Sequence, residues 1–235
     1  MILNYNGNDL PGDVGVLGWT VSTPAVSPRV VDVPGVRGKI RTGGKLGSRA
    51  VTIRMVLLGD TTAARLEALD ALNGWCYAEE PKPLFLPGRT DRYLLAECDG
   101  YAPPDLGDPD EEFEVSFVCH CPDYIAVAEQ SAQGLFSVGG TVSTPIRMEQ
   151  TLSTALTDPV WTIDGAARTI RLSGEVDAGL LVIDSEKGAV TLDGVDISDQ
   201  ATLDSDLHFF LEPGSHAVTA PTGVTANIYW RNRWI

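Results

Sequence analysis

Strict alternation of apolar and polar residues marks the clearest elements of this 235-residue chain. Between positions 113 and 121, one side is formed by Phe113, Val115, Phe117, Cys119 and Cys121. The stretch 51–58 has the same pattern, with one face formed by Val51, Ile53, Met55 and Leu57. Successive side chains of a strand point to opposite faces of its sheet, so both runs predict β-strands with one buried face.

The last quarter of the chain repeats this pattern between turn residues. The segment Leu180–Asp184 is apolar up to its last residue, and it is followed by alternation at Val190 and Leu192 and by a turn at Asp193-Gly194. One further strand is predicted to place Leu207, Phe209 and Leu211 on one side. The final strand is predicted to place Ile228, Trp230 and Trp234 on one side, opposite Tyr229, Arg231 and Arg233. Short strands at such close spacing predict an antiparallel sandwich or jelly roll.

One helix is predicted in the amino-terminal half. Asp60-Thr-Thr62 supplies side-chain oxygens for an N-cap, and Ala63–Leu72 follows with Leu66, Leu69 and Leu72 on one side. Asn73-Gly74 is typical of a helix end. The helix is therefore expected to be about three turns long and to pack across a sheet.

The segment before the strand at 51–58 is rich in proline, glycine and basic residues. Ser22–Pro34 holds three prolines, which favours an edge strand or an extended arm over a central strand. Pro34–Gly38 and Thr42–Gly47 are predicted to form a loop, and neither fits a phosphate-binding motif.

Composition is consistent with two β-rich domains. Apolar residues make up 43% of the chain, and 24 Gly with 15 Pro fit a protein of strands and turns. The chain is predicted to be mainly β, with an amino-terminal β-sandwich or barrel-like domain carrying one helix (1–130). A carboxy-terminal jelly-roll β-sandwich (131–235) follows, and Ala126–Thr144 is expected to be the linker and entry strand between the two domains.

Charge and the first residues exclude several classes of protein. A net charge of −15 opposes specific nucleic-acid binding, because contacts with phosphate supply most of that affinity. Met1–Tyr5 lacks the features of a signal peptide, and no window approaches about 18 uninterrupted apolar residues. The chain is therefore expected to be made in the cytoplasm and not to bind a membrane.

Candidate catalytic and metal-binding groups are sparse. Cys119 and Cys121 lack the usual spacing of zinc ligands and are expected to be buried thiols. A disulfide between Cys98 and Cys119 or Cys121 is a possibility after release into an oxidising medium. His120, His208 and His216 form no metal or nucleophile motif. Carboxylate pairs such as Asp204/Asp206 are better explained as charged turns than as a glycosidase pair. No catalytic residue, metal or cofactor is predicted.

A carbohydrate-binding module is the alternative function. Trp161, Trp230 and Trp234 offer the residue type that stacks on sugars, on a sheet of the carboxy-terminal domain. Trp230 and Trp234 share a predicted face with Ile228, which favours core packing instead.

The carboxy-terminal motifs resemble a known family. Leu181–Asp184, Val190–Gly194, Phe209–Gly214 and Ile228–Trp234 occur in the order found in the galectin-like domain of siphophage distal tail proteins. In that family, an "ID" strand precedes a "V-x-x-N/D-G" hairpin, an "L-x-P-G-x-N" turn and a closing "Y/W-R-x-R" strand. Here His216 stands at the usual Asn position of the turn.

The amino-terminal half resembles the other domain of the same family. The similar segments are Gly18-Trp19, Val33–Gly38, Gly47–Ile53, Asp91–Glu97 and Phe117–Tyr124. Family members show "P-G-x-x-G", "R-x-x-x-I" and "F-x-C-x-D/x-P-Y" at the corresponding places. The resemblance therefore covers nearly the whole chain.

This resemblance implies a structural role in the virion. The chain would form one or two hexameric rings at the tail tip, with the amino-terminal domain lining the DNA channel and binding the tail-tube protein. The galectin-like domain would hold the tail-associated tip protein and receptor-binding proteins or fibres. DNA would pass through the ring without specific binding, and no enzymatic activity is implied.

In such a ring, two oppositely charged segments become candidates for contacts between subunits. The segment Arg29–Arg54 holds seven basic residues and a single acid, whereas Glu97–Glu114 holds eight acids and no base. The candidate inter-subunit residues are Arg37, Lys39, Arg41, Lys45, Asp105, Asp108, Asp110, Glu111 and Glu112. A closed ring repeats one heterologous contact, so the Gly38–Gly47 loop of one subunit is expected to meet the Asp105–Glu112 loop of the next. A solvated basic loop is the alternative.

Overall fold

A computed structural model describes residues 3–35 and 37–235, so Met1, Ile2 and Val36 lie outside the described residues. The predictions for Met1–Tyr5 and for Pro34–Gly38 are therefore tested only on the other residues of these stretches. The chain divides into two compact units between Tyr124 and Ile125. Both are mainly β with antiparallel sheets, as the alternating pattern predicts. In the described part of the chain, no helix is long and apolar enough to cross a membrane.

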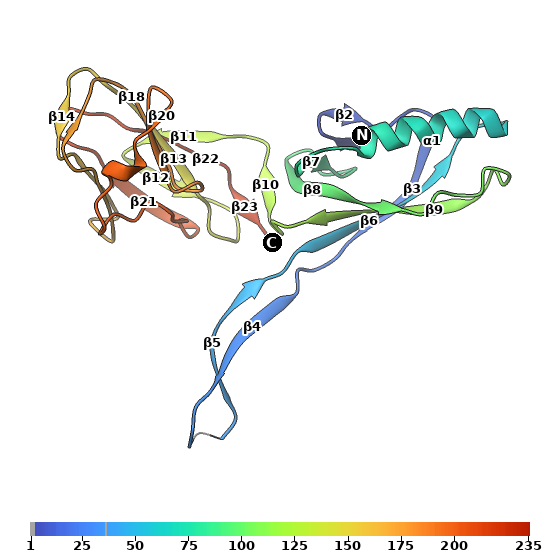
Figure 1. Cartoon of the computed structure of the whole chain (residues 1–235), viewed down its shortest axis with the longest axis horizontal. Coiled ribbons are helices and arrows are strands. Elements are labelled where there is room, and N and C mark those ends of the chain that lie inside the picture. Colours follow the sequence, from blue (N-terminus) through green and yellow to red (C-terminus); the bar gives the residue numbers. More distant parts are fainter. Residues whose placement is uncertain (1–2, 36) are drawn as a thin grey trace. The chain divides into compact units, whose positions relative to one another are not determined.

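The first unit combines a large sheet, a two-stranded arm and a helix. Its elements are β1 (Asn4–Tyr5), β2 (Asn8–Asp9), β3 (Val14–Val21), β4 (Val26–Asp32), β5 (Lys39–Leu46), β6 (Arg49–Leu57), α1 (Thr62–Cys76), β7 (Lys82–Phe85), β8 (Arg92–Tyr101) and β9 (Glu112–Cys119). The sheet has the strand order β2-β1-β7-β8-β9-β6-β3, and α1 lies over one of its faces (Figure 1). β10 (Tyr124–Ala126) spans the division between the units.

The core of the first unit lies between α1 and the sheet. The predicted buried faces of β6 and β9 are confirmed for Val51, Ile53, Met55, Leu57, Phe113, Val115, Phe117 and Cys119. Tyr5 lies at the centre, with its ring centroid 5.6 Å from Trp75 and 5.1 Å from Phe117. Its hydroxyl donates to the Ala96 carbonyl at 3.1 Å and the Trp75 indole N–H donates to the Asn8 carbonyl at 3.0 Å, so both polar atoms of this aromatic cluster are satisfied.

Helix α1 differs from its prediction in both its end and its buried face. Thr61 is the N-cap, and its hydroxyl accepts from the Ala64 N–H at 3.2 Å, as the Asp60-Thr-Thr62 motif suggests. The helix continues through Asn73-Gly74 to Cys76, because Trp75 and Cys76 are buried against the core. The face toward the sheet is formed by Arg65, Ala68, Leu72, Trp75 and Cys76, whereas Leu66 is 48% exposed. Burial of the last turn outweighs the roughly 1 kcal/mol cost of a helical glycine.

The second unit is a β-sandwich. Its elements are β11 (Gln130–Gln133), β12 (Leu135–Val138), β13 (Ile146–Leu152), β14 (Leu156–Thr157), β15 (Val160–Ile163), β16 (Arg168–Arg171), β17 (Glu175–Val176), β18 (Gly179–Asp184), β19 (Ala189–Leu192), β20 (Val195–Asp196), η1 (Ser198–Gln200), β21 (Gly214–Thr219), β22 (Asn227–Trp230) and β23 (Arg233–Trp234). One sheet has the order β11-β22-β13-β18-β19-β20, and the other has the order β12-β21-β15-β16. β14 and β17 pair separately.

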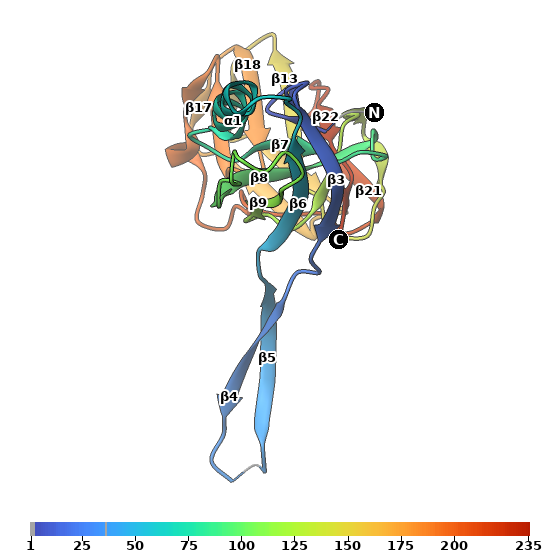
Figure 2. The ribbon, with the colours of Figure 1, turned by 90° about the vertical axis from the view of Figure 1, so that its right-hand side faces the viewer.

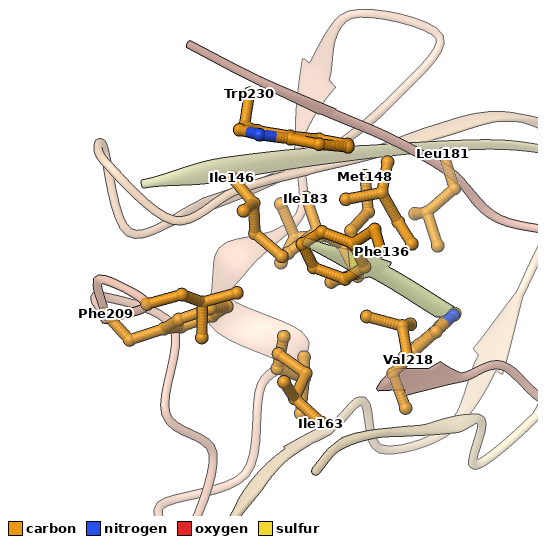
Figure 3. Close-up of a cluster of buried hydrophobic side chains, with 14 of the residues drawn as sticks. Phe136, Ile146, Met148, Ile163, Leu181, Ile183, Phe209, Val218 and Trp230 are labelled. Carbon is orange, nitrogen blue, oxygen red and sulfur yellow. The ribbon is translucent and has the colours of Figure 1, made fainter. Parts of the chain in front are cut away.

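Side chains from both sheets meet in one core (Figure 3). The labelled members of this core are Phe136, Ile146, Met148, Ile163, Leu181, Ile183, Phe209, Val218 and Trp230. Trp161 is fully buried, and its indole N–H donates to the side-chain oxygen of Gln150 at 2.8 Å. Apolar burial on this scale stabilises the unit by about 25 cal/mol for each Å² removed from water.

Two strand predictions near the end of the chain are wrong in detail. Phe209 and Leu211 are buried as expected, but the backbone around them is irregular and forms only an isolated bridge between Leu211 and Thr144. The final strand is interrupted between β22 and β23, which shifts the side-chain alternation. Arg233 is consequently buried and Trp234 half-buried, the reverse of the prediction, and the Arg233 guanidinium contacts Glu186 at 2.5 Å.

The segment predicted to be the linker and entry strand holds two strands of the second unit. Positions 126–144 contain β11, which pairs with β22, and β12, which pairs with β21. Small and polar residues in this stretch fit the exposed edge positions of a sandwich as well as they fit a flexible connection. Composition alone does not distinguish the two.

Candidate interaction site

The most exposed element of the first unit is the arm formed by β4 and β5. Every residue of both strands is exposed, and within the described chain the two strands pair only with each other. Their register runs from Val26 opposite Leu46 to Asp32 opposite Lys39, with a shift after Arg29. Figure 2 shows the arm extending beyond the ends of β3 and β6. Isolated two-stranded hairpins are marginally stable in water, so this arm is well suited to gain a partner.

The arm confirms one prediction and corrects another. Ser22–Pro34 was expected to be an edge strand or an extended arm, and it supplies the first strand of an arm. The predicted Gly38–Gly47 loop, by contrast, is mostly the strand β5. Glycine is uncommon in strands, and β5 has no alternating apolar pattern, so the sequence does not predict it. The hydrogen bonds to β4 hold its backbone extended.

Apolar side chains on the arm were missed by the sequence analysis. The residues Val26, Val30, Val31, Val33, Ile40 and Leu46 are all more than a third exposed. Val26 lies opposite Leu46, and Val31 lies opposite Ile40, so these apolar residues form cross-strand pairs. Contiguous exposed apolar residues mark interaction surfaces.

Basic side chains lie among these apolar residues. Arg37, Lys39, Arg41 and Lys45 are all exposed. Within the arm, Lys39 lies 3.6 Å from the Asp32 carboxylate, and the Arg41 side chain donates to the Gly43 carbonyl at 3.3 Å. The arm thus combines an apolar surface with positive charge in a chain that is strongly acidic overall.

The predicted acidic loop connects β8 with β9 and is held by hydrogen bonds. Gly107 N–H donates to the Asp105 carboxylate at 2.8 Å, and Asp110 N–H donates to the Asp108 carboxylate at 3.0 Å. The Glu111 carboxylate accepts from the Asp105 N–H. Glu112 lies 3.5 Å from Arg54, and both side chains are more than half exposed. Four of the five candidate acids are exposed, and Glu111 is half-buried.

Arg65, which no sequence pattern singled out, anchors this loop to α1. Its Nε and Nη2 donate to the Leu106 carbonyl at 2.9 and 2.7 Å, and its Nη1 donates to the Gly59 carbonyl at 2.6 Å. The residue is only 5% exposed. Because this buried guanidinium satisfies two carbonyls, it fixes the position of the loop that carries the acidic side chains.

Replacing Arg65 with Met is expected to lower the free energy of unfolding by about 2–3 kcal/mol, because the Leu106 and Gly59 carbonyls lose a charged donor. The matched control is Arg54→Met, which removes an exposed ion pair with Glu112 and should cost less than about 1 kcal/mol. Urea unfolding of both variants measures the difference. Equal losses in the two variants would contradict the anchoring role of Arg65.

The basic arm and the acidic loop adjoin opposite ends of β6. In β6, Arg49 is at the end next to the arm, whereas Val56 pairs with Glu112 at the end next to the acidic loop. Seven residue steps along a strand span about 23 Å. The arm therefore does not reach the acidic loop of its own chain, and a contact between the two requires a second copy.

The other candidate groups lie apart from this surface. Cys119 is buried as predicted, but Cys121 is half-buried and its thiol lies 3.9 Å from the Asp123 carboxylate, so the prediction for Cys121 is wrong. Cys76, Cys98, Cys119 and Cys121 are all free thiols, and the neighbour that acts on the Cys98 thiol is Cys76, not Cys119 or Cys121, the partners considered from the sequence. Among residues 3–35 and 37–235, no group of three or more His, Cys, Asp or Glu side chains is placed to hold a metal ion.

The sugar-stacking platform considered from the sequence is not formed. Trp161 and Trp230 are both buried in the core of the second unit. His216 lies 2.8 Å from Asp164 and 2.7 Å from the Glu212 carbonyl, so it occupies the family's Asn position with hydrogen bonds of its own. Burial raises the pKa of Asp164, but the hydrogen bonds from His216 and the Ala217 N–H outweigh it and lower the pKa below its ordinary value. The pair is a structural contact within the sandwich.

A comparison with protein-family models finds a match for the second unit. Residues 139–234 match the family model described as "Siphovirus-type tail component, C-terminal domain". This match confirms the resemblance that the carboxy-terminal motifs indicate. No curated protein sequence matches the chain.

Solved structures extend the likeness to the fold of the whole chain. The Dit protein (gp 19.1) of phage SPP1, described as a paradigm of the hub adsorption apparatus in phages that infect Gram-positive bacteria, has a TM-score of 0.80 at 18% identity. The alignment covers 100% of this chain and 99% of that one. A chain of the phage P2 baseplate in its activated conformation with Ca has a TM-score of 0.55 at 8% identity, covering 99% and 98% of the two chains. A chain of the phage p2 baseplate in its activated conformation with Sr has a TM-score of 0.52, and the alignment covers 94% of this chain and 92% of that one.

Proposed function

We propose that this protein is the structural hub at the distal end of a long-tailed phage tail. The observation that carries this proposal is the shared fold with SPP1 Dit, which extends over the whole of both chains apart from 1% of the SPP1 protein. The family match of residues 139–234 supports it independently from the sequence. The role is structural, without a catalytic step, and its site is the virion tail tip after synthesis in the host cytoplasm.

In the proposed assembly, six copies form a ring. The amino-terminal domain, placed at 1–130 from the sequence, lines the channel and binds the tail-tube protein. The carboxy-terminal domain, 131–235, holds the tail-associated tip protein and receptor-binding proteins or fibres. DNA passes through the ring without specific contacts, in keeping with the net charge of −15.

The arm and the acidic loop form the repeating contact of this ring. The basic side chains at 37, 39, 41 and 45 of one subunit face the acids at 105–112 of the next, while the apolar pairs of the arm are covered by the neighbour. Each exposed ion pair contributes only about 0–1 kcal/mol, so the charges set register and partner choice. The six exposed apolar residues supply most of the affinity.

Labelling tests the location directly. The chain, tagged with gold at its carboxy terminus, is mixed with polymerised tail-tube protein of the same phage and imaged by negative staining. The proposal predicts that label caps one end of each tube, because a hub binds only the last ring. Label along the sides of the tubes, or no binding at all, would exclude this function.

A further inference from the structure

Two thiols meet where the end of α1 packs on the sheet of the first unit. Cys76 is the last residue of α1, and Cys98 lies in β8. Each thiol is the first cause of the shift in the other's pKa, so the two side chains are neighbours. Aromatic packing brings the two residues together. The ring of Trp75, which precedes Cys76, has its centroid 6.0 Å from that of Phe117, and Phe117 pairs with Cys98 across the β8–β9 ladder. The buried helix end therefore fixes one thiol beside the other.

The effect of each thiol on the other divides the roles of the two sulfur atoms. The Cys76 thiol, aided by a backbone hydrogen bond from Gly100, lowers the pKa of Cys98 to about 7, although burial opposes the shift. The Cys98 thiol, together with burial, raises the pKa of Cys76 above its ordinary value. Cys98 is half-buried and Cys76 is 7% exposed, so the more acidic thiol is also the more accessible one. Thiolates, not thiols, attack disulfides.

We propose that Cys76 and Cys98 form a redox-sensitive pair that closes to an intramolecular disulfide when the protein leaves the reducing cytoplasm. The oxidant is a small disulfide such as oxidised glutathione. The Cys98 thiolate attacks one of its sulfurs, forms a mixed disulfide and releases one glutathione thiolate. Cys76, losing its proton to that thiolate or to water, then attacks the Cys98 sulfur and releases the second glutathione. Two electrons pass from the protein dithiol to the small disulfide, and one S–S bond is exchanged for another.

The other two cysteines are poorly placed to compete. Cys119 is fully buried, and burial raises the pKa of its thiol to about 12. Cys121 lies outside β9 and contacts the Asp123 carboxylate. The pair identified by the structure thus differs from the pairing of Cys98 with Cys119 or Cys121 suggested by the sequence.

The disulfide would tie the end of α1 to β8 and constrain the unfolded chain between positions 76 and 98. A loop of this size predicts a rise in the melting temperature of the first unit on the order of 10 °C. The chemistry of the two thiols is the same whether or not the chain assembles into rings. Failure of ring formation and failure of disulfide formation are therefore separate results.

Peptide mapping of the full-length protein tests the proposal. The wild type is equilibrated in mixtures of reduced and oxidised glutathione, alkylated, and digested with trypsin and an Asp-specific protease without reduction. These cleavages place Cys76 and Cys98 on separate peptides, both apart from Cys119. The expected product is one cross-linked pair of peptides, Cys76 to Cys98, together with a melting temperature about 10 °C higher than in dithiothreitol.

Cysteine variants separate the pair from the other thiols. Cys119→Ser is the control and should retain the cross-link, whereas Cys76→Ser should stop at the mixed disulfide of Cys98 with glutathione. The peptide map of the wild-type protein does not depend on whether any variant folds, so it tests the Cys76–Cys98 disulfide by itself. A cross-link from Cys98 to Cys119 or Cys121, a wild-type mixed disulfide that does not resolve, or four alkylated thiols at every glutathione ratio would overturn the proposal.

Discussion

Deleting the arm is expected to convert the assembled protein into a monomer whose folded units are unchanged. Where the arm leaves the sheet, the Gly47 N–H donates to the Ala25 carbonyl at 2.7 Å, so these two residues are neighbours. An Asn-Gly turn can therefore replace Val26–Leu46, because two-residue turns of this type join antiparallel strands. Every residue of β4 and β5 is exposed, so the deletion removes no side chain from the core.

Sedimentation velocity over a concentration series measures this effect. Loss of six exposed apolar residues per contact should weaken association by at least about 100-fold, since burial of each such side chain is worth on the order of 1 kcal/mol. The melting temperature should stay within about 2 °C of the wild type. Six-membered rings of the deletion protein would rule out the arm as the inter-subunit contact. A large loss of thermal stability would mean that the arm supports its own unit.

Reversing two charges on the arm, Lys39→Glu and Arg41→Glu, is expected to weaken ring assembly about 30-fold per contact. Two attractive pairs become repulsive toward the acids of the neighbouring loop, a change of about 2 kcal/mol at each contact. The defect should shrink as salt rises, because the Debye length falls from about 8 Å at physiological ionic strength to about 3 Å at 1 M. Wild-type assembly should itself weaken over the same salt series.

The control for this experiment changes the net charge by the same amount elsewhere. Arg171 and Lys187 are exposed basic residues of the second unit, and Arg171→Glu with Lys187→Glu leaves the arm intact. Sedimentation of both double variants across the salt series separates a specific contact from general repulsion. If the two variants assemble equally well at every salt concentration, the charged contact is wrong and apolar packing alone holds the ring.

Elements defined by side-chain alternation were predictable from the sequence because burial of one sheet face dictates them. The alternating apolar residues of β6 and the four from Phe113 to Cys119 in β9 are buried. Elements fixed by contacts distant in sequence were not predictable. Asn73-Gly74 is a good helix end locally, yet burial of Trp75 against Tyr5 and Phe117 carries α1 past it.

The candidate site was predictable as a distribution of charge but not as a structure. The basic and acidic segments were visible in the sequence as runs of like charge. The strand β5 was missed because its residues are all exposed and its glycines conceal the pairing with β4. Arg65 was missed because a buried arginine that binds backbone carbonyls leaves no periodic pattern.

The mass and shape of the assembled protein test the proposed hub most directly. Native mass spectrometry and averaged negative-stain images of the full-length chain should be collected at rising concentration and then with tail-tube protein. The expected species has six times the chain mass of 25.1 kDa, or twelve times for two rings, and its images show a ring with a central hole. A protein that stays monomeric at every concentration, even with tail-tube protein present, would contradict the account.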